Sequence, residues 1–219
     1  AFPQVGERFA VPRRDFPVCI TIAAHCVHAV GVAYAMKLRG EARAAVCAIG
    51  DGATSKGEFY EAMNGAGIWR LPVVFFVTNN QWAISVPRQA QSAAATLAQK
   101  AIAAGIPGEQ VDGNDLVAVR DAADRALTRA RCGEGPTVIE AVTYRLADHT
   151  TADDASRYRD AEEVAAAWAL EPLGRVRAYL VAAGAWSRTD DERLARECSE
   201  RVRQATDSYL AQGDPASTQ

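Results

Sequence analysis

Two kinds of apolar pattern alternate along this chain, and their order predicts its architecture. Short runs rich in β-branched residues are typical of buried strands; they occupy 44–49, 73–77 and 137–144, and a further short strand ends at 111–113. Longer segments repeat apolar residues every three or four positions, as amphipathic helices do; they occupy 23–38, 59–66, 93–104, 116–130 and 171–183. This alternation predicts an α/β fold, a doubly wound parallel sheet with C-terminal helices.

The helix after the first of these strands has the clearest sequence signals. Ser55 and Glu58 have the spacing of a capping box, which predicts that the helix begins there. Gly67 is a plausible stop. The face predicted to pack on the sheet consists of Phe59, Ala62, Met63 and Ala66.

The later helices follow from the same periodicity. Gly105 and Pro107 end the alanine-rich helix at 93–104, and Asn114 or Asp115 caps the next one. The predicted inward face of that next helix is Leu116, Val119, Ala123, Leu127 and Ala130. A last helix, starting after Ser187 or Thr189, has an apolar face formed by Leu194, Cys198, Val202, Ala205 and Tyr209. We expect 1–160 to form the α/β domain and 161–219 a helical extension of it.

Composition narrows the class of protein. The net charge is −3 and no long basic run occurs, so nucleic acid is not an expected partner. No apolar run of membrane length is found, so no membrane partner is expected. The 5 cysteines have neither zinc-site nor redox-pair spacing, and Cys47 lies in an apolar strand, so we expect reduced core thiols in a cytoplasmic protein. His25 and His28 are interpreted as polar contacts rather than as a set of ligands, because no carboxylate or thiol completes a metal constellation with the two of them.

Polar residues follow two of the predicted strands. Gly50-Asp51-Gly52 comes after the strand at 44–49, and Asn79-Asn80 after the strand at 73–77. The carboxyl ends of neighbouring parallel strands are where such sheets bind ligands. Carboxylate and amide oxygens suit Mg²⁺, and a helix start beside them favours phosphate. The unit therefore predicts a site for Mg²⁺ and a bound diphosphate.

Two commoner phosphate loops are excluded by their spacing. Lys56 precedes Gly57 and Glu58 follows, which is not the Gly-Lys-Ser/Thr of a P-loop, and no third glycine completes a dinucleotide loop. An isolated Gly-Asp-Gly is more often a structural turn. The paired asparagines after the next strand favour the cofactor site.

Gly50-Asp51-Gly52 with Asn79-Asn80 resembles the thiamine-diphosphate motif. The surrounding sequence resembles the α subunit of the E1 component of 2-oxo acid dehydrogenase complexes. The stretches that carry the resemblance are 28–34, 50–64, 79–85, 111–115 and 144–159. Family members carry a segment before the point corresponding to Ala1, so the N-terminal part of the family domain is expected to be missing here.

The resemblance implies a role for individual residues. Asp51, the Asn80 side chain and the Trp82 carbonyl would hold Mg²⁺, and backbone N–H groups of Gly52 and Ala53 would bind the diphosphate. Ile20 and Ile22 would contact the pyrimidine ring of the cofactor. His149 would be the catalytic residue, touching cofactor phosphate and substrate from an active-site loop at 146–160. Composition alone would make this charged segment a solvated loop.

The resemblance also implies an activity and partners. The chain would act in thiamine-diphosphate-dependent oxidative decarboxylation of a 2-oxo acid, with pyruvate expected first. Branched-chain and acetoin dehydrogenase α subunits are alternatives, as is a non-catalytic or truncated assembly subunit. The expected partners are an E1 β subunit in an α2β2 heterotetramer and a lipoyl-bearing E2, in a bacterial cytoplasm.

Overall fold

The computed structural model describes residue 16 and residues 19–211. The polypeptide divides into two compact units, one spanning Cys19–Val176 and the other containing, of the described residues, 16 and 177–211. Helix α7 (Pro172–Ala182) runs across the boundary. The division into 1–160 and 161–219 stays a prediction.

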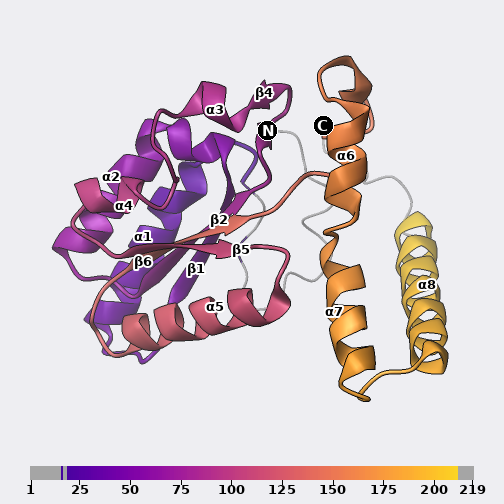
Figure 1. The fold of residues 1–219 in the computed structure, drawn as a ribbon. Coiled ribbons are helices and arrows are strands. Elements are labelled where there is room, and N and C mark those ends of the chain that lie inside the picture. Colours follow the sequence, from indigo (N-terminus) through magenta and orange to yellow (C-terminus); the bar gives the residue numbers. More distant parts are fainter. Residues whose placement is uncertain (1–15, 17–18, 212–219) are drawn as a thin grey trace. The chain divides into compact units, whose positions relative to one another are not determined.

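A four-stranded parallel sheet forms the centre of the first unit (Figure 1). Its strand order is β1 (Ala45–Gly50), β2 (Val73–Asn79), β6 (Thr137–Val142) and β5 (Gly108–Asp112). The crossovers are provided mainly by α2 (Gly57–Ile68) and α5 (Leu116–Arg131), and α1 (Ala24–Leu38) precedes the sheet. The predicted α/β fold with a parallel sheet and helices is confirmed.

The two faces of the sheet carry separate hydrophobic clusters. Val73, Phe75 and Val77 of β2 belong to the cluster that includes buried residues of α1 and α2. Val74 lies on the opposite face with Ala122 and other residues of α5. Because side chains alternate along a strand, β2 must be apolar on both faces, and this is why its sequence is a continuous apolar run.

The start of α2 differs from its prediction. A short 3₁₀ turn, η2 (Gly52–Ser55), precedes the helix, whose N-cap is Lys56 without a side-chain cap. The predicted capping box is wrong, since Ser55 Oγ donates to the Gln91 carbonyl over 3.3 Å and Glu58 pairs with Lys56. The apolar face was predicted correctly: the four predicted residues are all buried, and the helix continues past Gly67 to Ile68.

The prediction of an alanine-rich helix at 93–104 is wrong. Only α4 (Lys100–Ala103) is helical there, preceded by α3 (Arg88–Gln91) and a small hairpin of β3 (Trp82–Ala83) and β4 (Val86–Pro87). Arg88 donates to the Ser92 and Ala94 carbonyls, and the Ala98 N–H donates to the buried Glu140 carboxylate over 2.9 Å. These side chains engage the backbone groups that a continuous helix would use, so tertiary contacts override the alanine propensity.

Two further predictions are corrected in part. Asp115 does cap α5, accepting from the N–H groups of Val117 and Ala118. The buried face of that helix, however, is Ala122, Ala126 and Ala130, while Leu116 is exposed. Small side chains at four-residue intervals let the helix lie close to the sheet, which a row of leucines would prevent.

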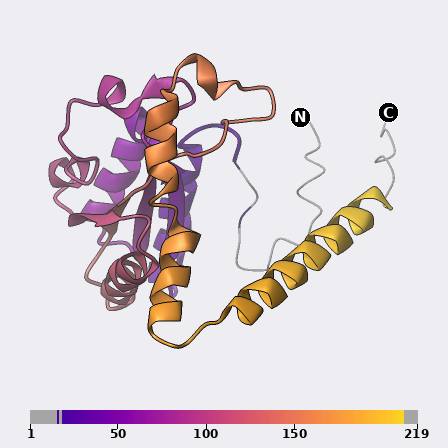
Figure 2. The ribbon, with the colours of Figure 1, turned by 45° about the vertical axis from the view of Figure 1, so that its right-hand side comes forward.

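The second unit contains the end of α7 and the long helix α8 (Arg188–Leu210), drawn in yellow in Figure 2. Ser187 and Asp190 form a capping box at the start of α8, as the choice of Ser187 predicted. Arg177 and Asp191 form an ion pair of 2.8 Å between α7 and α8. Leu194 and Val202 of the predicted apolar face are exposed. Within the described residues, no helix combines the length and the apolar character needed to span a membrane.

Candidate functional site

The polar residues that follow β1 and β2 come together at one edge of the sheet. Gly50 pairs with Thr78 in the parallel ladder, so Asp51 and Asn79 lie at corresponding positions just beyond it. Asn80 follows Asn79, the last residue of β2. The sheet therefore brings Asp51 and Asn80 to neighbouring carboxyl ends, as predicted from the order of the strands.

Asp51 is buried, with only 3% of its surface exposed. Gln91 donates from Nε2 to Oδ2 of this carboxyl group over 3.0 Å. Burial raises the pKa of Asp51, and the hydrogen bond from Gln91 and the charge of Arg145 oppose this increase. A buried carboxylate that is costly to ionise is stabilised by a bound cation, so the position suits a metal ligand.

Gly52 permits a close approach of two backbone segments. A Cβ atom at this position would lie 2.7 Å from the Cβ of Ala83, closer than two non-bonded carbon atoms can approach. Residues of η2 therefore pack directly under the β3–β4 hairpin. The first N–H groups of a helical turn have no partner within the turn, and here they belong to Gly52 and Ala53.

The two asparagines have different environments. Asn79 is buried and donates from Nδ2 to Oε1 of Glu140 over 2.7 Å. Its side chain therefore forms a hydrogen bond within the protein interior. Asn80 is only partly buried, and its Oδ1 accepts from the Trp82 N–H over 3.2 Å. That bond fixes the turn but leaves the amide oxygen able to accept or coordinate again. Gln81, between them and the hairpin, has a left-handed φ of 72°.

A buried lysine supports the backbone of Asp51. Lys100 donates from Nζ to the carbonyl oxygen and to Oγ1 of Thr54, over 2.8 and 3.0 Å. Thr54 Oγ1 in turn donates to the Asp51 carbonyl over 2.7 Å. Desolvation lowers the pKa of Lys100. Sequence reasoning missed Lys100, Glu140 and Gln91, because each acts across a long sequence separation that no local pattern reveals.

Arg145 ties the segment after β6 to the β3–β4 hairpin. Its guanidinium donates to the carbonyls of Trp82 and Ile84, over 3.2 and 2.8 Å, and to the Tyr158 hydroxyl over 2.7 Å. The Trp82 carbonyl, an expected metal ligand, thus already accepts one hydrogen bond and keeps a second lone pair. The rings of Trp82 and Tyr158 also pack, with centroids 5.5 Å apart.

The family profile described as "Dehydrogenase E1 component" matches residues 11–217. The chain belongs to this family. The resemblance seen in the motifs is confirmed, and the family implies thiamine diphosphate as cofactor.

The relatives of this chain include E1 α subunits that are named for two different substrates. The chain is 49% identical, over 178 residues, to the 3-methyl-2-oxobutanoate dehydrogenase subunit alpha of Mycobacterium tuberculosis strain H37Rv, covering 81% of this chain and 48% of the relative. It is 46% identical, over 187 residues, to the pyruvate dehydrogenase E1 component subunit alpha of Staphylococcus epidermidis strain ATCC 12228, covering 85% and 50%. The chain spans about half the length of the curated relatives it matches.

The segment that resembles the E1 active-site loop is held by its own hydrogen bonds. Tyr158 donates from its hydroxyl to Oδ2 of Asp153 over 2.5 Å, and the same oxygen accepts from the His149 N–H over 2.8 Å. These bonds lower the pKa of Asp153. Arg159 donates to the carbonyls of Arg145 and Ala147. The loop is therefore an internally bonded structure rather than an unstructured connection.

Three predicted site residues lie outside the group formed by Asp51, Gly52, Ala53, Asn80 and Trp82. His149 is exposed, and Ile20 and Ile22 are 73% and 58% exposed. Among the described contacts, none joins these side chains to Asp51 or Asn80. Their roles in an E1 component stay predictions.

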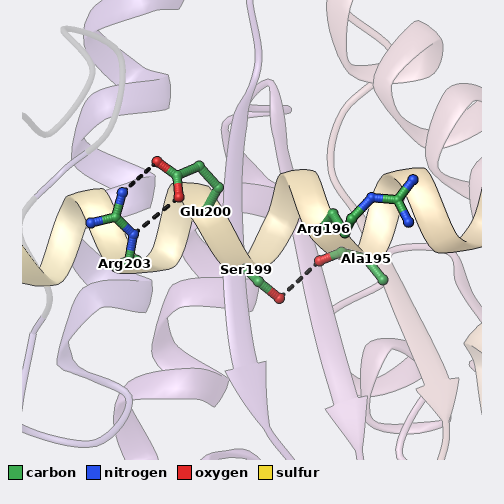
Figure 3. Close-up of a pocket in the computed structure, with 5 residues that line it drawn as sticks. All are labelled: Ala195, Arg196, Ser199, Glu200 and Arg203. Atoms are coloured by element: carbon green, nitrogen blue, oxygen red, sulfur yellow. Dashed lines mark hydrogen bonds and ion pairs between the residues drawn. The ribbon is translucent and has the colours of Figure 1, made fainter.

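A separate shallow hollow lies on α8 alone. Its lining residues, shown in Figure 3, are Ala195, Arg196, Ser199, Glu200 and Arg203. Ser199 donates to the Ala195 carbonyl one turn earlier, and Arg203 pairs with Glu200. Because one exposed helix face supplies every lining residue, we do not regard this hollow as the E1 site.

Proposed function

We propose that this chain contributes the α-subunit half-site of an E1 component, which decarboxylates a 2-oxo acid with thiamine diphosphate and transfers the acyl group to a lipoyl-bearing E2. The observation that supports this most is the buried Asp51 carboxylate beside Asn80 at neighbouring strand ends. Family membership and the names of the relatives support the reaction class.

We further propose that Asp51, the Asn80 amide oxygen and the Trp82 carbonyl oxygen hold Mg²⁺. All three are hard oxygen donors, which Mg²⁺ prefers. The N–H groups of Gly52 and Ala53 would bind the diphosphate that Mg²⁺ accompanies. The close contact at Gly52 supports this, because glycine there lets the backbone itself form the floor of the site.

When bound, thiamine diphosphate supplies the electron sink for decarboxylation, and the protein supplies position and electrostatics. Gln91 orients the Asp51 carboxylate through its hydrogen bond. Arg145 and Tyr158 fix the loop that carries His149. His149, exposed on that loop, is proposed to contact the cofactor phosphate and the substrate.

A β subunit is proposed to complete the site in an α2β2 heterotetramer. It would supply the glutamate that activates the aminopyrimidine, since sequence reasoning found no candidate carboxylate for that task in this chain. Ile20 and Ile22, exposed in this chain, are proposed to be covered by the cofactor. The proposed setting is the bacterial cytoplasm.

The proposed substrate is a 2-oxo acid. Relatives named for 3-methyl-2-oxobutanoate and for pyruvate match at similar identity, 49% and 46%. Pyruvate was expected first from the sequence. Parallel assays with both substrates, and with acetoin, would assign the class.

The deciding experiment titrates thiamine diphosphate and Mg²⁺ into the chain with and without a β subunit, by calorimetry. Asp51→Ala should abolish Mg²⁺-dependent binding, and Asn80→Ala should weaken it less if water replaces the amide oxygen. Asp124→Ala, at an exposed ion pair on α5, is the control. Unchanged affinity in Asp51→Ala would contradict the site.

The same preparation tests assembly. The chain alone should not decarboxylate either acid with an artificial acceptor, and the chain with β subunit should. Turnover by rigorously β-free protein would contradict the proposed half-site. Cofactor binding without turnover in the reconstituted complex would favour the alternative, a non-catalytic assembly subunit.

A further inference from the structure

Three side chains with metal-binding chemistry meet on the side of β1 facing α1. His25 and Cys26 belong to α1, and Cys47 belongs to β1. One ligand atom from each lies within 4.8 Å of the others, and the two Sγ atoms are 3.7 Å apart. Both thiols are buried and His25 is half-buried. Sequence reasoning interpreted His25 as a polar contact and the cysteines as reduced core thiols, so it did not predict this group.

The hydrogen bonding of His25 prepares it as a ligand. Its Nε2 lies 2.9 Å from the Ala48 carbonyl oxygen, which can only accept, so Nε2 carries the proton. Nδ1 therefore keeps its lone pair. This buried nitrogen has no hydrogen-bond partner among the described residues. A metal-ligating histidine commonly donates its other N–H to a backbone carbonyl in this way.

We propose that His25, Cys26 and Cys47 form a binding site for a thiophilic divalent cation such as Zn²⁺. Two thiolates on one tetrahedral Zn²⁺, each about 2.3 Å from the ion, are roughly 3.8 Å apart, close to the separation observed here. A Cys₂His set of ligands favours Zn²⁺ over Mg²⁺, because Mg²⁺ prefers oxygen ligands. The site is distinct from the Asp51 oxygen site.

Binding would replace the protons of both thiols and join α1 to β1. In the described part of the chain, no fourth His, Cys, Asp or Glu joins this group, so water or a backbone carbonyl would complete the coordination. Cys47 lies within β1, four residues before Asp51, which follows that strand. The cation would thereby stabilise the segment that presents Asp51, whichever cofactor that residue holds.

The test uses the reduced, chelator-treated chain and Co²⁺ as a spectroscopic probe, with Zn²⁺ as competitor. One Co²⁺ per chain should bind with a thiolate charge-transfer band and intense tetrahedral visible bands, and Zn²⁺ should displace it. Cys26→Ser, Cys47→Ser and His25→Gln should each weaken binding at least about tenfold, since loss of an outer-shell partner alone costs about 10–100-fold. Cys132→Ser, Cys198→Ser and His28→Gln change exposed residues and should bind as the parent does.

His25→Gln tests whether misfolding, rather than loss of a ligand, explains weakened metal binding in the variants. It leaves both thiols in place and can still donate to the Ala48 carbonyl. Zn²⁺ should raise the melting temperature of the parent chain and of the exposed-residue variants, but not that of His25→Gln. A parent chain without a thiolate–Co²⁺ band, or a His25→Gln variant that binds as tightly as the parent, would overturn the proposal.

Discussion

The Gln91 amide donates to the Asp51 carboxylate over 3.0 Å, so a short helix after the hairpin orients the acidic residue at the end of β1. We predict that Gln91→Leu weakens Mg²⁺-dependent binding of thiamine diphosphate by about tenfold, because an outer-shell partner typically contributes about 10–100-fold to metal affinity. Calorimetric titration checks this. Gln89→Leu, on an exposed residue of the same helix, is the matched control. Equal losses in both variants would mean that Gln91 has no special role.

The pH dependence follows from the raised pKa of Asp51. A carboxyl group with a higher pKa in the folded state makes the metal-free protein less stable as pH rises from its ordinary value, 3.8, through the raised value. We predict that Asp51→Asn increases the melting temperature of the metal-free chain at pH 7, because the amide has no charged form that must be buried. The gain should disappear below the ordinary pKa of the carboxyl group.

The same variant should lose Mg²⁺ binding, which separates stability from function at one residue. Asp124→Asn removes an exposed carboxylate of α5 and should change neither property. Thermal denaturation measured from pH 3 to pH 8, with and without Mg²⁺, checks both statements. A destabilised Asp51→Asn protein at neutral pH would contradict the prediction.

Glu140 is predicted to be a main determinant of stability. Its fully buried carboxylate accepts from Asn79 Nδ2 over 2.7 Å and from the Ala98 N–H over 2.9 Å. Glu140→Leu would leave both donors without an acceptor, at a cost of about 2–4 kcal/mol in unfolding free energy. Chemical denaturation measures this loss. Glu134→Leu, at an exposed turn, should cost little.

His149 is predicted to affect acyl transfer more than metal binding. It lies exposed on the loop that Arg145 and Tyr158 hold, and a residue acting in general acid–base catalysis typically contributes about 10²–10⁴-fold. In a reconstituted complex, His149→Ala should lower transfer to lipoyl-E2 by such a factor while Mg²⁺ affinity stays unchanged. His28→Ala changes another exposed imidazole and is the control. Near-parental transfer by His149→Ala would make the loop a connection without a catalytic role.

Local sequence was sufficient to predict those elements that depend mainly on residues close together in the chain. The apolar runs that became β1, β2 and β6, the inward face of α2 and the Asp115 cap were all predicted from neighbouring residues. The positions of Asp51 and Asn80 also followed, because parallel strands joined by a helix end at the same edge of a sheet. Periodicity and strand order carry this information without any knowledge of distant contacts.

Tertiary structure decided everything that depends on partners far along the chain. The segment at 93–104 is mostly irregular because Glu140 and Arg88 bind its backbone, and the Asp51 carboxylate is oriented by Gln91. Cys47 meets His25 and Cys26 only because β1 packs against α1. Each of these contacts joins groups whose separation in space is set by packing of the sheet and helices, and no local pattern of apolar and polar residues encodes that separation.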